Sequence, residues 1–129
     1  MTAALITARS RSDVATTVRH LTATLQRRGI TLFATIDHGA GARGVGLELA
    51  DEVVLVFGDP AAGTPLMQAD PRAGLDLPLR ILVWSGDDGT QLAFRDPRAM
   101  AGDFELAGQA ETLARLRGVL DALVAEAGG

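Results

Sequence analysis

A segment with four of the chain's five prolines lies between two apolar, strand-like runs, and it constrains the fold more than any other feature. It reads GDPAAGTPLMQADPRAGLDLP over residues 58–78, and LRILVW follows it. Because proline lacks an amide donor and breaks strands and helix interiors, no long regular element is expected here. Compact domains rarely carry about twenty structureless residues between strands. We therefore expect an ordered crossing, with short helical turns after Thr64 and Asp70, that lies over the sheet beside Asp37 and His38.

The periodicity of apolar residues predicts the elements on each side of this crossing. A helix is expected after an N-cap at Ser12, and a second one over residues 110–127, where leucines recur at helical spacing. The expected strands are residues 3–8, 30–38, 52–57, 79–84 and 90–94, the last two joined by a hairpin at residues 86–89. The fold class is therefore α+β. We expect a single domain over residues 1–129, a two-layer sandwich in the order β-α-β-β-(long ordered crossing)-β-β-α, with helices covering one face of the sheet.

Composition excludes several kinds of chemistry. The chain has no cysteine and no lysine, so thiol nucleophiles, thiolate metal sites, disulfides and lysine Schiff bases are all ruled out. With two histidines, a transition-metal centre is not expected, although carboxylates leave a hard-cation site open. The net charge of −4 is spread along the chain, which disfavours nucleic acid as a partner. No run approaches a membrane span or a secretory leader, so the chain is expected to be an unprocessed, soluble, cytoplasmic protein that carries no cofactor.

Two glycine-rich stretches imitate nucleotide-binding motifs. Residues 39–44 match G-x-G-x-x-G, but the segment that follows looks extended, so a flexible connection between strands is the favoured interpretation. Residues 58–64 imitate a phosphate loop, but Thr64 stands where the lysine must be. Thr64 and Pro65 are better interpreted as the N-cap and first residue of a short helix, whose N-terminus can bind an anion.

The candidate site residues gather at the ends of the predicted strands. Asp37 and His38 close one strand, and His38 is either a titratable group beside a pocket or a structural residue that holds a loop. The crossing carries three aspartates that offer either a general base or a cation site, or else satisfy backbone donors in turns. The predicted ligand-binding set is Asp37, His38, Gly58, Asp59, Gly63, Thr64 and Asp76.

The succession IDHGAGA, LVFGDPAAGTPLMQADP and LDLPLRILVW resembles the bacterial and archaeal family called domain of unknown function 302. The resemblance covers the chain from about Asp13 to the hairpin after Trp84 and weakens towards the C-terminus. It implies a compact α+β domain with no established activity, cofactor or substrate. The family's isoleucine-aspartate-histidine element is matched by residues 36–38 and its glycine-threonine-proline element by residues 63–65. Asp59 departs from the asparagine common in the family, and Phe94 and Arg95 depart from its tyrosine-asparagine pair.

Three functions are compatible with these residues. The first is a small-molecule or anion-binding module, lined by His38, Thr64 and the amides of residues 58–64, that acts as an oligomer. The second is a structural or regulatory homodimer that uses the crossing or a strand edge, with Leu66, Met67 and Leu75 as contacts. The third, and least favoured, is an acid–base enzyme that pairs His38 with Asp59 or Asp76, since no nucleophile is identifiable.

Overall fold

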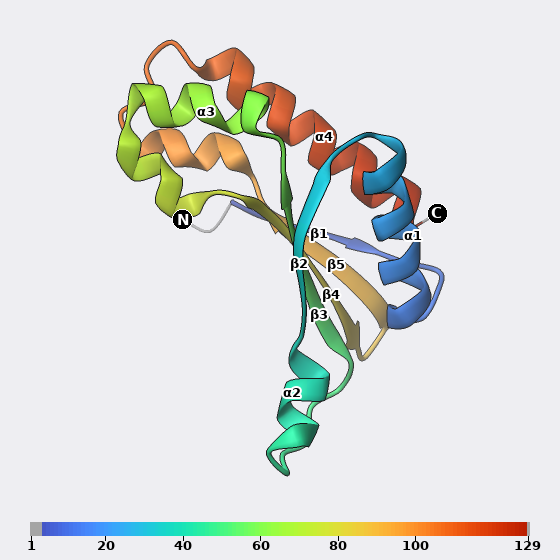
Figure 1. The fold of residues 1–129 in the computed structure, drawn as a ribbon. Coiled ribbons are helices and arrows are strands. Elements are labelled where there is room, and N and C mark those ends of the chain that lie inside the picture. The colour runs from blue at the N-terminus through green and yellow to red at the C-terminus, as the bar shows by residue number, and fades with distance from the viewer. Residues whose placement is uncertain (1–3, 129) are drawn as a thin grey trace.

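A five-stranded antiparallel sheet forms one layer of the protein and helices form the second (Figure 1). The computed structural model describes residues 4–128. Along the sheet the strands follow the order β1-β5-β4-β3-β2, and each pairs antiparallel with its neighbours. Their bounds are β1 (Leu5–Arg9), β2 (Thr31–Asp37), β3 (Glu52–Gly58), β4 (Leu79–Gly86) and β5 (Gly89–Arg95).

Two long helices, α1 (Val14–Arg27) and α4 (Ala110–Gly128), cover one face of this sheet (Figure 1). Strand side chains alternate between the two faces, and the inward set of β3 is buried while its neighbours in sequence are half-buried. The main core contains Leu21, Leu25, Leu55, Phe57, Ile81, Val83, Leu120 and Leu123. The predicted α+β architecture, with helices on one face, is confirmed.

The proline-rich crossing is ordered, as its composition predicted. It forms α3 (Pro60–Ala69) and the short 3-10 helix η1 (Pro71–Asp76), which lie with η2 (Pro97–Gly102) at one end of the sheet (Figure 1). A second apolar cluster holds these segments against the N-terminal half of α4. Its buried members are Leu66, Ala73, Met100, Leu106, Leu113 and Leu116.

The start of α3 differs from the expectation. Asp59 is the N-cap and Pro60 the first helical residue, whereas Thr64 and Pro65 lie inside the helix. Asp59 accepts a hydrogen bond from the Ala61 amide at 3.0 Å, and Pro60 needs no amide partner in the first turn. The earlier Asp-Pro pair thus begins the helix before the Thr-Pro pair is reached, and the expected start at Thr64 is wrong.

Two further local expectations are corrected. The glycine-rich residues after β2 are not a flexible connection but a seven-residue helix, α2 (His38–Gly44), capped by Asp37 through the Ala40 amide at 2.8 Å. The N-cap of α1 is Asp13, which accepts from the Thr16 amide at 2.8 Å, and not Ser12. The β4–β5 hairpin is confirmed, with a positive φ of 101° at Gly89.

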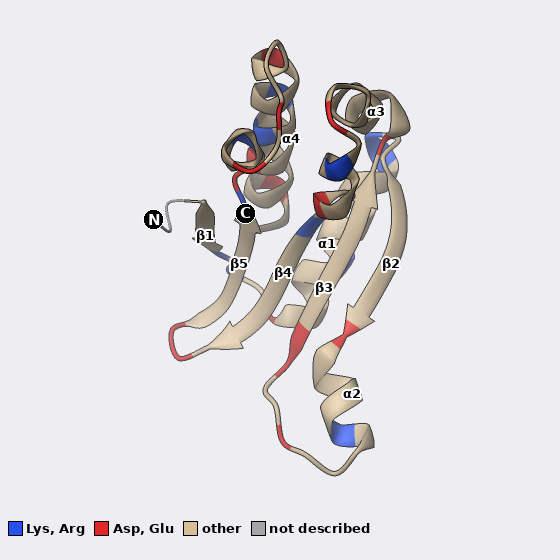
Figure 2. Cartoon of the chain, turned by 90° about the vertical axis from the view of Figure 1, so that its left-hand side faces the viewer, with Lys and Arg blue, Asp and Glu red and all other residues tan. Residues whose placement is uncertain are grey.

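On the other face of the sheet, no helix of residues 4–128 lies over the lower part (Figure 2). We call this the uncovered face. Strand register places these outward residues on it: Ala34 and Ile36 of β2, Glu52, Val54 and Val56 of β3, Arg80, Leu82 and Trp84 of β4, Gln91, Ala93 and Arg95 of β5, and Leu5, Thr7 and Arg9 of β1.

Candidate functional site

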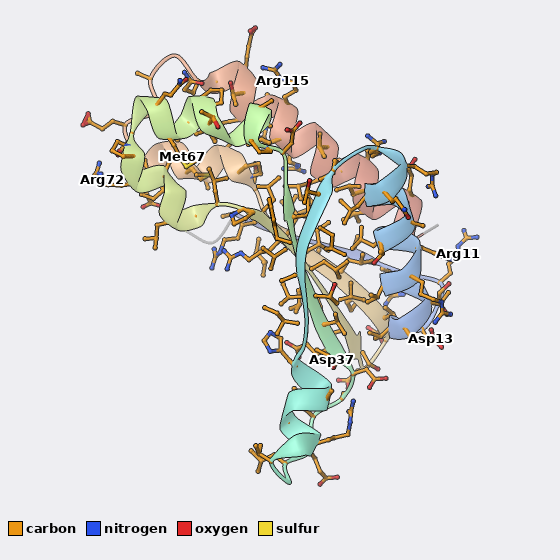
Figure 3. The ribbon with its side chains drawn as sticks, in the orientation of Figure 1. Arg11, Asp13, Asp37, Met67, Arg72 and Arg115 are labelled. Atoms are coloured by element: carbon orange, nitrogen blue, oxygen red, sulfur yellow. The ribbon has the colours of Figure 1, made fainter. Side chains whose placement is uncertain are left out.

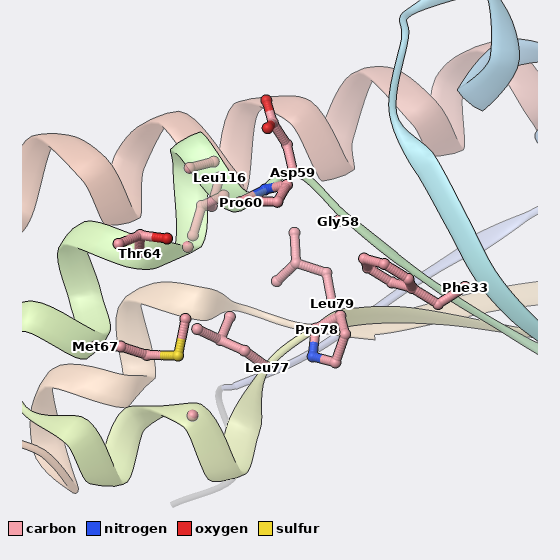
Figure 4. A pocket seen from close by; sticks show the side chains of 13 residues that line it. Phe33, Gly58, Asp59, Pro60, Thr64, Met67, Leu77, Pro78, Leu79 and Leu116 are labelled. Atoms are coloured by element: carbon pink, nitrogen blue, oxygen red, sulfur yellow. The ribbon is translucent and has the colours of Figure 1, made fainter.

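An apolar pocket of about 260 Å³ lies at the end of the sheet where the crossing begins and ends. Figure 4 shows it between the first turns of α3, the chain that enters β4, and Phe33 of β2. Its lining is dominated by carbon atoms, with Met67, Leu77, Pro78, Leu79 and Leu116 among the contributors. The pocket can therefore take a small apolar group out of water.

Two glycines line this pocket beside its apolar groups. A Cβ atom added to Gly58 would lie 3.4 Å from Phe33 Cε2 and 3.5 Å from Pro78 Cβ. One added to Gly63 would lie 3.5 Å from Leu77 Cδ1. A Cβ at either position would thus be in ordinary van der Waals contact with apolar groups that line the pocket, and a longer side chain would extend among them.

Polar groups of the pocket belong to the start of α3. Gly58, Asp59, Gly63 and Thr64, four of the seven predicted site residues, line the pocket. The Asp59 side chain caps the Ala61 amide, and the Asp59 carbonyl accepts from the amides of Ala62 and Gly63 at 2.9 and 3.1 Å. These donors are therefore already engaged, and the helix start offers an incoming anion a carboxylate in place of free amides.

Asp37 and His38 lie at the other end of the sheet. Because β2 and β3 are antiparallel, Thr31 pairs with Gly58 while Asp37 pairs with Val53. Figure 3 shows Asp37 at the base of α2, well away from Met67 of α3. Within one chain the structure does not bring His38 to the pocket, or to Asp59, so the crossing does not lie beside that corner as expected. Asp76, at the end of η1, is not among the residues that line the pocket.

Two aspartates of the crossing, Asp59 and Asp70, satisfy backbone donors. Buried Asp70 accepts from the amides of Arg72 and Glu105 at 3.0 and 2.9 Å and forms a two-pronged ion pair with the Arg72 guanidinium. The hydrogen bonds from Arg72, followed by that from Glu105, hold the pKa of Asp70 well below its usual range. Within residues 4–128 no group of three or more histidine or carboxylate ligands gathers to hold a metal ion.

A second carboxylate cluster was not among the predicted site residues. Buried Asp96 binds Arg98 and also the Arg117 guanidinium of α4, whose Nη1 lies 2.6 Å from Asp96 Oδ2. Arg117 also stands over the Phe94 ring, 5.6 Å from its centroid. The hydrogen bonds from Arg98, the largest influence, lower the pKa of Asp96 to about 2. This network ties the end of β5 to η2 and α4.

A comparison with family models decides what kind of domain this is. Residues 6–123 match the model described as domain of unknown function DUF302. The chain belongs to the DUF302 family. The match runs through most of α4, so the likeness extends further towards the C-terminus than the sequence motifs suggested. A solved structure with a similar fold is the uncharacterised conserved DUF302 protein of Bacillus stearothermophilus, with a TM-score of 0.87, 17% identity and coverage of 96% of this chain and 98% of that one.

Two curated relatives from Brucella are similar in sequence to most of this chain. The fluoride-specific ion channel FluC 1 of Brucella suis biovar 1 (strain 1330) is 41% identical over 98 residues, which are 75% of this chain and 39% of the relative. FluC 1 of Brucella abortus biovar 1 (strain 9-941) is 41% identical over the same share of this chain and 36% of its own length. The DUF302 chain thus spans well under half of these relatives. No helix within residues 4–128 is long and apolar enough to cross a membrane.

Nine of the thirteen residues that line the pocket were not in the predicted ligand-binding set, among them Phe33, Pro78, Leu79 and Leu116. Phe33 lies at a bulge, where the register of β2 against β3 shifts between Leu32 and Ala34. A bulge turns a side chain away from the regular alternation. In the sequence, Phe33 is an apolar residue at a position where the alternation of its strand would place a polar one.

Proposed function

We propose that this DUF302 domain binds a small, compact, largely apolar molecule in the pocket between α3, η1 and the start of β4. The observation that carries the proposal is an apolar cavity of about 260 Å³ with Gly58 and Gly63 in its lining. Pockets for drug-sized ligands occupy roughly 300–1,000 Å³. A ligand for this site is therefore smaller than a typical drug.

The rim supports a neutral or cationic polar end for the ligand. Asp59 is exposed at the rim, and Thr64 supplies a hydroxyl that can donate or accept. The amides at the start of α3 already have acceptors, which weakens the case for an anion. Fluoride, the ion in the names of the Brucella relatives, is a small anion, and an apolar cavity beside a carboxylate, with the Thr64 hydroxyl as its side-chain donor, is a poor site for it.

Ligand-induced stabilisation tests the proposal. The protein is melted in the presence of phenol, indole, benzoate or sodium fluoride, each over a range of concentrations. We expect phenol and indole to raise the melting temperature, benzoate to have a smaller effect and fluoride to have none at matched ionic strength. Stabilisation by fluoride alone would contradict the apolar site.

Neighbouring alanines on α3 provide a matched pair of variants. Ala62 lines the pocket and Ala61 is exposed and does not. Ala62→Leu fills the cavity and should abolish stabilisation by phenol, whereas Ala61→Leu, the same change one residue away, should retain it. If both variants respond like the unmodified protein, the ligand binds elsewhere.

A further inference from the structure

The uncovered face carries an apolar strip that crosses the middle of the sheet. Register places Ile36, Val54 and Leu82 side by side on β2, β3 and β4, with Val56 and Trp84 on the adjoining rows. Ile36 is 46% exposed, and Val54, Val56, Leu82 and Trp84 are half-buried although no helix covers them. A contiguous apolar surface of this kind on a monomer marks an interaction site.

Charge is distributed unevenly along this strip. Arg80 stands beside Val56 at the end near the crossing, and Glu52 stands beside Trp84 at the end near α2. Figure 2 shows the basic colour on the upper part of β4 and the acidic colour at the lower end of β3. Within residues 4–128 neither Arg80 nor Glu52 takes part in an ion pair. Four residues, or about 13 Å, separate their rows.

This pattern is complementary to itself when one copy is turned end for end. A two-fold axis that lies in the sheet plane, crosses the strands and passes through the Val54–Leu82 pair keeps each strand opposite its own equivalent and exchanges the two ends. It brings Arg80 of one copy close to Glu52 and Trp84 of the second copy, and the reverse contact follows from the symmetry. An axis parallel to the strands would instead place the Arg80 ends of the two copies together, and likewise the two Glu52 ends.

The segment from α2 to β3, residues 38–51, provides a further surface, which we call the arm. It projects beyond the end of the sheet (Figure 1) and exposes Val45 by 73%, Leu47 by 65% and Leu49 by 42%. At the opposite end, the crossing exposes Leu75 by 85%, and Phe33 and Met67 are also exposed. The same two-fold axis sets each apolar arm over the apolar crossing of the other copy.

The area of the uncovered face is too small for a stable dimer without the arms. Four strand spacings of about 4.8 Å and a strand of about 23 Å give the sheet face a flat area of about 440 Å². Stable interfaces bury roughly 800 Å² on each partner. The face alone falls short of this, and the exposed apolar groups of arm and crossing lie where an end-for-end dimer would enlarge it.

We propose that the uncovered face and the arm form the interface of a homodimer with this two-fold axis, in which the arm of each copy covers the pocket of the other. Arg80 pairs with Glu52 of the second copy, and the apolar strips of the two sheets pack together. Leu66, one of the contacts expected from the sequence, is fully buried within its own chain and makes no part of this surface. The dimer itself does not depend on ligand binding; only the role of the arm as a cover for the pocket rests on the proposed function.

The first test is the mass of the unmodified protein by size exclusion with light scattering. We expect about twice the 13.4 kDa of one chain at micromolar concentration. Trp84, the single tryptophan, lies on the interface, so its fluorescence should shift to the red on dilution as the dimer dissociates. A monomeric mass at every concentration up to the millimolar range overturns the proposal.

Charge reversal tests the axis. Arg80→Glu and Glu52→Arg should each weaken dimerisation about tenfold or more, since each change occurs twice across the axis. The double variant should restore most of the lost affinity. Arg115→Glu, a reversal at an exposed residue of α4, is the matched control and should leave the mass unchanged. Circular dichroism confirms that each variant is folded, and a dimer that ignores both single reversals rules out this axis.

One comparison distinguishes the proposal of a ligand site from the proposal of a dimer. If phenol stabilises the monomeric Arg80→Glu variant as strongly as the unmodified dimer, the arm contributes nothing to binding and the cover is disproved while the proposed function stands. If phenol stabilises neither form but the mass is dimeric, the proposed function fails and the dimer stands.

Discussion

At the scale of single residues, the most connected side chain is the Asp96 carboxylate. It accepts from the Arg98 amide at 3.0 Å, from the Arg98 guanidinium and from Arg117 of α4. Asp96→Asn keeps the shape but removes the charge, leaving Arg117 without this partner in a half-buried site. We expect a loss of about 2–3 kcal/mol in the free energy of unfolding near neutral pH, measured by urea denaturation.

The same substitution should change how stability depends on pH. The pKa of Asp96 is about 2 in the folded protein, below the ordinary value of about 3.9 expected when unfolded. Because the folded value is depressed, the contribution of Asp96 is complete above about pH 4 and is lost as pH falls towards 2. Asp96→Asn should therefore cost little at pH 2. An equal cost at pH 2 and pH 7 would mean that packing rather than charge is responsible.

Sequence reasoning interpreted some aspartates correctly and missed their best signal. The structural alternative for Asp59 and Asp70, that they satisfy local backbone donors, is what the hydrogen bonds show. The chain contains Asp-Pro-Arg-Ala twice, at residues 70–73 and 96–99, and each copy starts a 3-10 helix in which the arginine grips the aspartate. That identity was visible in the sequence, but the partners Glu105 and Arg117 were not, because they come from distant parts of the chain.

At the scale of elements, the start of α1 gives a direct test of the corrected cap. The Asp13 carboxylate accepts from the Thr16 amide at 2.8 Å, and no hydrogen bond to the Ser12 hydroxyl is observed within residues 4–128. Asp13→Ala should lower the free energy of unfolding by about 1 kcal/mol, the usual value for an N-cap. Ser12→Ala, one residue away, should change it by a few tenths at most. Thermal melts of the two variants side by side measure the difference, and equal effects would contradict the assignment.

Within the described residues, the bounds of the strands and of α4 were predicted to within two residues, because their apolar periods are long and regular. The β4–β5 hairpin and α4 show this, since Gly89 and the leucine spacing leave little choice. The expected start of the first strand, Ala3, lies outside the described residues. The short helices failed for a different reason: α2 was not expected at all, and α3 was expected to start at Thr64. α2 is rich in glycine and has no apolar stripe, and its helix depends on the Asp37 cap, whereas α3 has two cap-and-proline pairs and only tertiary contacts with the second apolar cluster separate them.

At the scale of the whole molecule, the residues of the predicted site lie at two opposite ends of the sheet, because β2 and β3 run antiparallel. Sequence placed Asp37, His38 and the start of the crossing at strand ends, and all of them are at strand ends. In an antiparallel pair, however, the C-terminal ends of the two strands lie at opposite ends of the sheet. The end of β2, with Asp37 and His38, is therefore about 20 Å from the end of β3, where the crossing begins. The proposed end-for-end dimer would bring these residues together between copies. It sets the arm of one copy, which begins at His38, over the crossing of the other.

Such a dimer links folding to association, and this gives a prediction for the intact protein. Association stabilises folded chains and not unfolded ones, so the melting temperature should rise with protein concentration. Over a hundredfold range of concentration we expect a rise of several degrees for the unmodified chain and for Arg115→Glu. Arg80→Glu should show a smaller rise, displaced to higher concentration, and the double variant with Glu52→Arg should recover the original dependence. Calorimetry at matched scan rates measures all four, and a melting temperature independent of concentration would mean that the apolar strip of β3 and β4 is left open to solvent.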